Sequence, residues 1–319
     1  MKILITGGAG FIGSNIAESL LNDKRTSLVR VLDNLETGHL SNIESIINHP
    51  KFEFINGDIR KIDECNKACI DIDVICHQAA LGSVPRSIAN PLATHQTNVN
   101  GFINMLESAR QNNIKRFVYA SSSSVYGDLQ ESPKVESRVG KVLSPYASTK
   151  MTNELYAESY SKCYEMTIIG FRYFNVFGPK QDPEGPYAAV IPLFIKAALQ
   201  GKSPIINGDG TITRDFTPVD NVVQINTNAI FNELEPNKHY VFNVACGQTT
   251  SLNKLWQIIK NITGSKADAI HGPNRKGDIL HSLADVNLAK KHLDYKPEFL
   301  LEPFLSKTVE WYKTICIKS

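Results

Sequence analysis

The sequence predicts an α/β protein with a Rossmann-type doubly wound parallel sheet and a smaller C-terminal α/β domain. Two observations indicate this class. Short apolar runs alternate with longer helical stretches along the first half of the 319-residue chain. These runs are continuously hydrophobic, which is typical of strands covered on both faces, and the first of them leads directly into a glycine-rich turn.

Six runs are expected to form strands of one sheet, in the order K-I-L-I-T, S-L-V-R-V-L-D, F-E-F-I-N-G-D, D-V-I-C-H-Q-A-A, R-F-V-Y-A-S-S and T-I-I-G-F-R-Y-F-N. The helical stretches between them supply right-handed crossovers. After Asn175 glycine and proline interrupt the chain, and helices follow at about 191–199 and 252–262. We therefore expect a first domain over residues 1–175, rejoined by a strand near 239–245, and a second over 176–319. Ligands should bind in the crevice between them.

The overall composition excludes several classes of protein. The chain carries 34 basic and 32 acidic residues, so its charge gives no reason to expect nucleic acid or an anionic membrane as a partner. It shows neither a leader pattern nor an apolar run long enough to span a bilayer, and we expect a soluble cytoplasmic protein. Its six cysteines are scattered, and Cys76 beside His77 lacks further ligands, so no metal is expected.

A dinucleotide-binding turn follows the first strand. T-G-G-A-G-F-I-G places Gly7, Gly10 and Gly13 where backbone amides can approach a pyrophosphate at a helix N-terminus. Asp33 ends the second strand, where a carboxylate accepts hydrogen bonds from the adenosine ribose and repels a 2′-phosphate. The predicted cofactor is therefore NAD. Asp58 and Ile59, at the end of the third strand, are expected to border the adenine.

A tyrosine and a lysine are spaced as an acid and base pair. Tyr146 and Lys150 stand four residues apart in S-P-Y-A-S-T-K, which places both on one face if this segment is helical. A tyrosine titrates near ~10, so it takes a proton from an alcohol at neutral pH only where its anion is stabilised. We expect the charge of Lys150, together with a cationic nicotinamide, to lower the pKa of the phenol.

Five ordered motifs resemble those of the extended short-chain dehydrogenase/reductase family over essentially the whole chain: T-G-G-A-G-F-I-G, H-Q-A-A, S-S-S-S-V-Y-G, Y-A-S-T-K and R-Y-F-N-V-F-G-P. The resemblance implies that Tyr146 is the general base, that Lys150 holds the ribose, and that Ser122 lies beside the nicotinamide. It also implies a set of NAD contacts: Gly7, Gly10, Phe11, Ile12, Gly13, Asp33, Asn34, Asp58, Ile59, Gln78, Ala79, Ala80, Asn98, Tyr146, Lys150 and Tyr173.

Within that family the chain most resembles bacterial UDP-N-acetylhexosamine 4-epimerases of polysaccharide synthesis, through A-A-L-G-S-V-P-R-S, I-N-G-D-G, R-D-F and H-S-L-A-D. This implies reversible inversion at C4 of UDP-GlcNAc and UDP-GalNAc, and also of UDP-Glc and UDP-Gal, through a 4-keto intermediate. The products would be precursors of surface polysaccharides such as O-antigen. The implied substrate contacts are Gly82, Ser83, Ser122, Ser123, Ser124, Tyr146, Asn175, Ala189, Val190, Asn207, Arg214, Arg275, Asp278 and Ser282.

Serines separate the reaction and substrate classes. The 4,6-dehydratases of the family carry an Asp-Glu pair directly before V-Y-G, because eliminating water needs an additional acid and base. This chain has Ser123 and Ser124 there, which leaves oxidation of a single alcohol. Epimerases restricted to unacetylated sugars have a bulky tyrosine at the position of Ser282. A serine leaves room for a 2-acetamido group.

Three other functions stay open. Epimerisation of 2-acetamido uronic acids uses the same chemistry and would be marked by a basic residue beside the sugar C6. UDP-glucuronate decarboxylation also begins with oxidation at C4. A catalytically silent dinucleotide-sensing protein usually lacks the Tyr or Lys of Y-x-x-x-K, and both are present here.

The resemblance also implies a homodimer. In this family the helix that follows Tyr146 joins the helix near 98–110 in a four-helix interface between two subunits. The tyrosines at 156, 160 and 164 are expected to lie on a packed face of the first of these helices.

Overall fold

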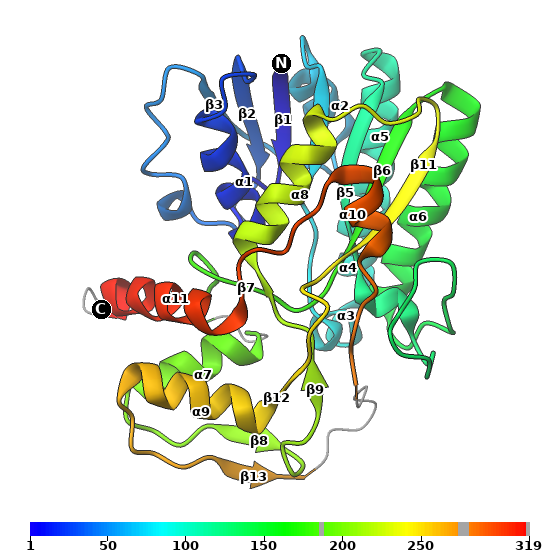
Figure 1. Ribbon diagram of the computed structural model, residues 1–319. Helices are drawn as coiled ribbons and strands as arrows, with labels where there is room; N and C mark the ends of the chain where they lie inside the picture. The colour runs from blue at the N-terminus through cyan, green and yellow to red at the C-terminus, as the bar shows by residue number, and fades with distance from the viewer. Residues whose placement is uncertain (185–187, 274–280, 317–319) are drawn as a thin grey trace.

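A seven-stranded parallel sheet forms the larger part of the molecule (Figure 1). The computed structural model describes residues 1–184, 188–273 and 281–316. The strand order is β11-β6-β5-β4-β1-β2-β3, and every neighbouring pair is parallel. The strands are β1 Lys2–Thr6, β2 Leu28–Asp33, β3 Phe52–Asn56, β4 Val74–His77, β5 Arg116–Ser122, β6 Thr167–Tyr173 and β11 His239–Val244. The predicted fold class is confirmed.

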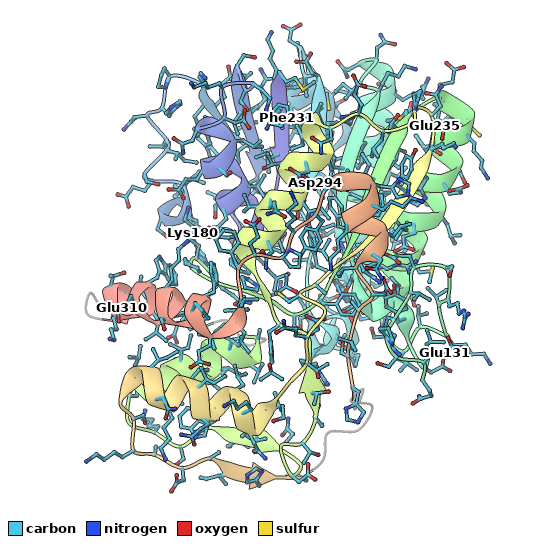
Figure 2. The ribbon with its side chains drawn as sticks, in the orientation of Figure 1. Glu131, Lys180, Phe231, Glu235, Asp294 and Glu310 are labelled. Carbon is cyan, nitrogen blue, oxygen red and sulfur yellow. The ribbon has the colours of Figure 1, made fainter. Side chains whose placement is uncertain are left out.

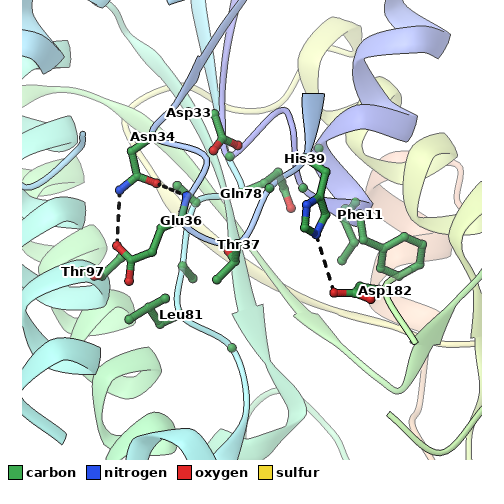
Figure 3. Close-up of a pocket in the computed structure, with 18 of the residues that line it drawn as sticks. Phe11, Asp33, Asn34, Glu36, Thr37, His39, Gln78, Leu81, Thr97 and Asp182 are labelled. Atoms are coloured by element: carbon green, nitrogen blue, oxygen red, sulfur yellow. Dashed lines mark hydrogen bonds and ion pairs between the residues drawn. The ribbon is translucent and has the colours of Figure 1, made fainter. Parts of the chain in front are cut away.

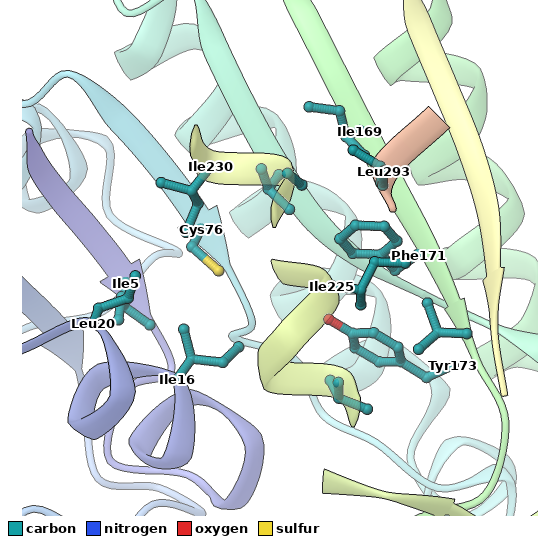
Figure 4. Packing of buried hydrophobic residues seen from close by; sticks show 14 of the residues in the cluster. Ile5, Ile16, Leu20, Cys76, Ile169, Phe171, Tyr173, Ile225, Ile230 and Leu293 are labelled. Carbon is teal, nitrogen blue, oxygen red and sulfur yellow. The ribbon is translucent and has the colours of Figure 1, made fainter. Parts of the chain in front are cut away.

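Helices cover both faces of this sheet, which explains why its central strands place apolar residues on both sides. Within β1, Ile3 and Ile5 join the core on one face, and Leu4 joins the core on the other. The first core is covered by α1 Phe11–Leu21, α8 Val219–Phe231 and α10 Asn287–Leu293, and Figure 4 shows its packing around Phe171 and Ile225. The second is covered by α2 Ile62–Cys69, α5 Gly101–Gln111 and α6 Pro145–Tyr164.

A separate core lies in the smaller domain. It is built from α7 Val190–Leu199, α9 Leu252–Thr263 and α11 Leu301–Cys316, together with β7 Val176–Phe177, β8 Ile205–Asn207 and the segment around Phe216. Short strands complete this part: β9 Thr213–Arg214, β10 Thr217–Pro218, β12 Thr250–Ser251 and β13 Ile270–Gly272. Three elements of the second half, α8, β11 and α10, pack with the first core instead. The range 176–319 therefore contributes to both cores.

The chain reverses direction across the sheet between β1 and β4. From β1 it runs to β2 and β3 on one side, and it then crosses to β4, β5 and β6 on the other. Ligands of such sheets bind outside the carboxyl ends of the strands at this point. The smaller domain is tied down nearby, because Lys180 (Figure 2) pairs with Glu18 of α1 at 2.8 Å and Asn15 donates to the Pro179 carbonyl.

Among the described residues, no helix combines the length and the apolar character needed to cross a bilayer.

Candidate active site

A cavity of about 650 Å³ opens at the reversal point of the sheet. Twelve of the predicted NAD contacts line it: Gly7, Gly10, Phe11, Ile12, Gly13, Asp33, Asn34, Asp58, Ile59, Gln78, Ala79 and Ala80. Three predicted substrate contacts, Gly82, Ser83 and Ala189, line it as well. The cavity therefore extends from the glycine turn after the first strand to the residue that precedes α7.

The glycine turn leaves no room for side chains. Gly7 has φ of +69°, and a Cβ there would lie 2.7 Å from the Ala79 backbone. A Cβ at Gly13 would lie 2.2 Å from the Gly7 carbonyl oxygen. No side chain caps the first turn of α1, so no side chain competes with a ligand for the backbone amides there. This closely packed turn with uncapped amides suits a pyrophosphate.

Asp33 shapes the ribose end of the cavity. Its side chain is buried and accepts hydrogen bonds from the amides of Ala9 at 2.9 Å and Leu35 at 2.8 Å. Burial raises the pKa of Asp33, and these two bonds offset part of that rise. Next to it, Asn34 donates to Asp58 at 3.2 Å. Burial acts to raise the pKa of Asp58, but hydrogen bonds from Arg60 outweigh it and the pKa lies below its usual value.

Asn98 does not line the cavity, although it was among the predicted NAD contacts. It is 1% exposed, exchanges hydrogen bonds with the backbone of Leu81 and donates to Thr149 of α6. Its neighbour Thr97 lines the cavity instead (Figure 3). Thr97 is 9% exposed, and its hydroxyl finds no hydrogen-bond partner within the described parts of the chain. Asn98 thus joins the cavity wall to α6, and Thr97 offers the free polar atom.

The predicted catalytic residues meet at the end of β5 and the start of α6. Ser144 caps α6 by accepting from the Ala147 amide at 3.1 Å, and the helix places Tyr146 and Lys150 on one face, as predicted. Ser122 lies close enough to Tyr146 to act on the pKa of its phenol. The Lys150 ammonium lies 5.9 Å from the centre of the Tyr146 ring and donates to the Ala120 carbonyl at 2.7 Å. These three side chains lie outside the lining of the cavity described above.

The protein alone does not make Tyr146 a stronger acid. Burial raises the pKa of Tyr146 above its usual value, and Ser122 offsets only part of this rise. In the chain without ligands Lys150 is not among the groups that shift the pKa of Tyr146. Burial also lowers the pKa of Lys150 to about 8. Desolvation is the largest cause of both shifts.

Tyr173 lies below the cavity rather than in its wall. Its hydroxyl donates to Gln78 at 3.2 Å and accepts from Asn226 at 2.8 Å. Gln78 also donates to Asn226 and to the sulfur of Cys76. Tyr173 therefore fixes the orientation of a cavity residue. The Cys76 thiol is hydrogen-bonded within this network. The His77 ring is hydrogen-bonded to the Thr6 hydroxyl at 2.8 Å. The described residues hold no cluster of metal ligands.

Two predicted substrate contacts have unusual backbone conformations. Ser83 has φ of 92° and Asn175 has φ of 36°, in a region that residues other than glycine rarely adopt. Asn175 donates to the Asp215 carbonyl at 3.1 Å. Ala189 precedes α7, whose first turn has no side-chain cap. Strained residues and a free helix N-terminus are typical of binding sites, although neither defines a ligand.

Four of the remaining predicted substrate contacts lie on the smaller domain: Val190, Asn207, Arg214 and Ser282. The Ser282 amide donates to the carbonyl of Thr213 in β9, beside Arg214, at 3.3 Å. Asn207 ends β8 and pairs with Gly272. Val190 begins α7. Ser123 and Ser124 follow Ser122 in a 3-10 turn, and the buried Ser124 hydroxyl has no partner among the described residues. Arg275 and Asp278 lie outside the described residues.

Comparison with known proteins places this site in a family. The model of the NAD dependent epimerase/dehydratase family matches residues 3–245. The chain belongs to that family. A UDP-glucose 4-epimerase of Mycolicibacterium smegmatis is 36% identical over 315 residues, covering 98% of this chain and 99% of the relative.

Two solved structures are similar over nearly their whole length. A UDP-N-acetylglucosamine 4-epimerase from Methanobrevibacter ruminantium, in complex with UDP-N-acetylmuramic acid, has a TM-score of 0.92 and 39% identity, covering 98% of each chain. A UDP-glucuronic acid 4-epimerase from Bacillus cereus, in complex with UDP-glucuronic acid and NAD, has a TM-score of 0.90 and 30% identity, covering 99% of this chain and 100% of that one.

The cofactor of this epimerase/dehydratase is NAD. The site fits it, because the glycine turn excludes side chains, Asp33 keeps an acceptor at the ribose end and Thr97 offers a hydroxyl with no partner in the described structure. A second carboxylate, Glu36, lines the same end and pairs with Arg60 at 2.9 Å. Negative charge there opposes a 2′-phosphate.

Sequence reasoning missed several cavity residues of this epimerase/dehydratase. The loop after Asp33 brings Glu36, Thr37, Gly38 and His39 to the wall, and His39 contacts Asp182 across the opening at 3.6 Å (Figure 3). The sequence could have indicated these residues, because the loop directly follows the carboxyl end of a predicted strand. Gln181 and Arg86 also line the cavity, and the side-chain amide oxygen of Gln181 has no partner among the described residues.

Proposed function

We propose that this enzyme is an NAD-dependent UDP-sugar 4-epimerase that prefers UDP-GlcNAc and UDP-GalNAc, also accepts UDP-Glc and UDP-Gal, and supplies surface polysaccharides such as O-antigen. Ser282 is the observation that carries the substrate preference. It is a small, half-buried side chain next to β9, where a tyrosine would fill the space of an acetamido group. The similarity to the Methanobrevibacter epimerase supports the same preference.

Tyr146, Ser122 and Lys150 would carry the proton chemistry. The phenolate of Tyr146 takes the proton of the sugar 4-hydroxyl, with Ser122 hydrogen-bonded to the same oxygen. Tyr146 returns that proton after the 4-keto sugar has turned its other face to the site. NAD, when bound, would accept the hydride from C4 and give it back to the opposite face, which inverts C4, and it would bring a positive charge. Because burial raises the tyrosine pKa in the chain alone, that charge is needed to stabilise the phenolate.

The turn after β5 argues against dehydration. Ser123 and Ser124 occupy the positions where a dehydratase needs an acid and a base. The Ser124 amide donates to the Ser122 hydroxyl at 3.2 Å, so the turn positions Ser122. Neither hydroxyl can remove a proton from carbon at its ordinary pKa.

The two parts of the molecule would divide the ligands. Residues 1–175 with β11 would hold NAD. Asn175, at the boundary, and Asn207, Arg214, Arg275 and Asp278 of the smaller domain would hold the UDP group. The free N-terminus of α7 near Ala189 suits the diphosphate of the sugar nucleotide.

One observation favours the uronic acid alternative. Arg86 lines the cavity three residues after Ser83, and a basic side chain near the sugar would suit a C6 carboxylate. The similarity to the Bacillus epimerase points the same way. This candidate differs from the first only in substrate, so one experiment separates them.

The enzyme is also proposed to be a homodimer. Large apolar side chains lie exposed on α3 Val84–Ala89, α4 Pro91–His95 and α6, which pack against one another. Leu92 is 75% exposed, Ile88 64% and Leu155 63%. A second copy placed on this surface would remove the three side chains from water.

The decisive experiment is to incubate the purified enzyme, without added cofactor, with UDP-GlcNAc, UDP-Glc and their uronic acid forms, and to resolve the products. We expect conversion of UDP-GlcNAc to an isomer of unchanged mass. Ser282→Tyr should lose about 10- to 100-fold in kcat/KM for the acetylated sugar and keep its activity on UDP-Glc. Tyr146→Phe should lose ~10²–10⁴-fold on every substrate.

Other outcomes would overturn parts of this proposal. Conversion of UDP-Glc but not UDP-GlcNAc would refute the role of Ser282. Turnover of the acid forms alone would favour the uronic acid alternative, and release of carbon dioxide with a pentose product would indicate a decarboxylase. Near-normal epimerisation by Tyr146→Phe would refute the assignment of the base.

A further inference from the structure

A buried ion pair lies directly behind the proposed base. Glu154 is one helical turn after Lys150 on α6, and it is 7% exposed. Its carboxylate accepts from Nε of Arg172 at 3.0 Å and from NH2 of Arg172 at 2.7 Å. It also accepts from the hydroxyl of Ser121 at 2.6 Å. Ser121 immediately precedes Ser122, so one carboxylate touches the strand end that carries the proposed catalytic serine.

Arg172 extends this contact to the following turn. Its side chain is 5% exposed, it donates to the Glu136 carbonyl at 3.0 Å, and its guanidinium carbon lies 4.9 Å from the centre of the Tyr126 ring. Tyr126 ends the 3-10 turn that contains Ser123 and Ser124. The pair thus connects α6, β5, β6 and the serine turn.

Glu154 is also the anion that acts on Lys150. Glu154 on α6 and His77 on β4 act on or respond to the charge of Lys150, and the centre of the Tyr146 ring lies 5.9 Å from its ammonium. Arg172 of β6, Tyr119 of β5 and His239 of β11 interact in turn with Glu154. Burial lowers the pKa of Lys150 to about 8, and the charge of Glu154 opposes that fall. His77 is neutral, because burial lowers its pKa to about 3.

We propose that Glu154, held by Arg172, is a positioning residue of the reaction: it keeps Ser121 and α6 in register and keeps the Lys150 ammonium charged beside Tyr146. The proposal rests on the roles proposed above for Tyr146 and Lys150. A purely structural ion pair would affect folding and the amount of active enzyme. A pair that maintains the charge of Lys150 also sets the pH at which activity disappears on the alkaline side.

The test is the pH profile of kcat for the purified holoenzyme on the UDP-hexose that it converts. Glu154→Gln removes the charge, and the alkaline limb of the profile should move about one unit to lower pH, with kcat at pH 8 reduced about fivefold and KM little changed. Glu154→Asp retains the charge and should leave the limb in place. Glu53→Gln, which removes one partner of the distant Arg30 pair, is the matched control and should match the wild type.

A second variant keeps the proposal testable if the single change prevents folding. Glu154→Gln/Arg172→Gln removes both charges and leaves no buried ion without its partner. Because Glu154, and not Arg172, is the charge that acts on Lys150, this variant should also show the alkaline limb at lower pH. An unshifted limb in a folded variant that lacks the Glu154 carboxylate would overturn the proposal. Activity retained by Tyr146→Phe would instead refute the proposed function, so the two failures are distinguishable.

Discussion

At the scale of single residues, desolvation dominates the chemistry of the proposed base. A phenol and an ammonium placed near each other attract only when both are charged, and burial disfavours both charged forms. The pKa of Tyr146 is raised and the pKa of Lys150 is lowered to about 8, so the two shifts bring the groups toward a neutral pair. An additional positive charge is needed to favour the phenolate. The cofactor brings that charge only when it is bound. Tyr146 would therefore remove the substrate proton only in molecules that hold NAD.

Thr97 provides a test of the cofactor site at this scale. Thr97→Val keeps the shape of the side chain and removes the hydroxyl that has no partner among the described residues. Losing one hydrogen bond to a ligand costs about 0.5–1.5 kcal/mol, so we expect NAD affinity to fall roughly 3- to 10-fold. The measurement is titration of NAD into protein stripped of cofactor. Thr94→Val removes a neighbouring hydroxyl that already bonds Asn90 and should leave the affinity unchanged. Equal affinities for Thr97→Val and wild type would refute the contact.

Thr97 lines the cavity next to the predicted NAD contact Asn98, and the sequence does not indicate which of the two faces the cavity. Residues 96–100 form a π-helix, in which one extra residue per turn changes the side chain that faces the cavity. No residue type in Q-T-N-V-N signals that change. By contrast, Gly7, Gly13 and Asp33 were predictable because the requirement for each follows from its own chemistry and from its place after a strand.

At the scale of elements, α6 carries most of the proposed site because both ends of this helix are well defined. Ser144 caps its N-terminus, Pro145 occupies its first turn, and Glu165 ends it in the left-handed conformation. Along its length Tyr146, Lys150 and Glu154 face the sheet, and Leu155 and Tyr156 are exposed. The helix therefore serves the site on one face and is available for association on another.

The exposed surface of α3, α4 and α6 leads to a prediction about assembly. The wild-type protein should have twice the chain mass of 35.4 kDa by light scattering. Leu92→Glu/Leu155→Glu places two charges in the proposed interface and should give a monomer. Ile205→Glu changes an equally exposed isoleucine of the smaller domain and should leave the dimer intact. A dimeric double variant would exclude this surface as the interface.

At the scale of the whole molecule, the parallel sheet was predictable from the sequence. It was harder to predict which elements of the second half pack back against that sheet. Six strands were recognisable because each is apolar on both faces, and β11 followed from another such run. The segments that carry α8 and α10 gave no comparable signal. Their amphipathic patterns fit either core, and only the tertiary packing decides that Ile225 and Leu293 join the sheet. The same limitation applies to the ion pair of Glu154 and Arg172, whose partners are distant in sequence.

The buried His77 at the centre of the sheet predicts how the whole fold responds to acid. It is 2% exposed, bonds Thr6 and lies between Phe102 and Phe117. Burial lowers its pKa to about 3 in the folded chain. Below pH ~6.5, the ordinary value for histidine, the unfolded chain therefore binds a proton that the folded chain rejects. The free energy of unfolding should fall by about 1.4 kcal/mol for each pH unit below that value, until the folded pKa is reached.

His77→Gln should remove this contribution, because glutamine does not titrate. Urea unfolding at pH 7, 6 and 5 should show a smaller loss of stability for the variant than for the wild type. The comparison is made at each pH because burial lowers the pKa of His239, which adds to the loss, and raises the pKa of Asp215 to about 6, which opposes it. His95→Gln, a substitution on the surface, is the matched control. Parallel losses in His77→Gln and wild type would show that His77 does not set the acid response.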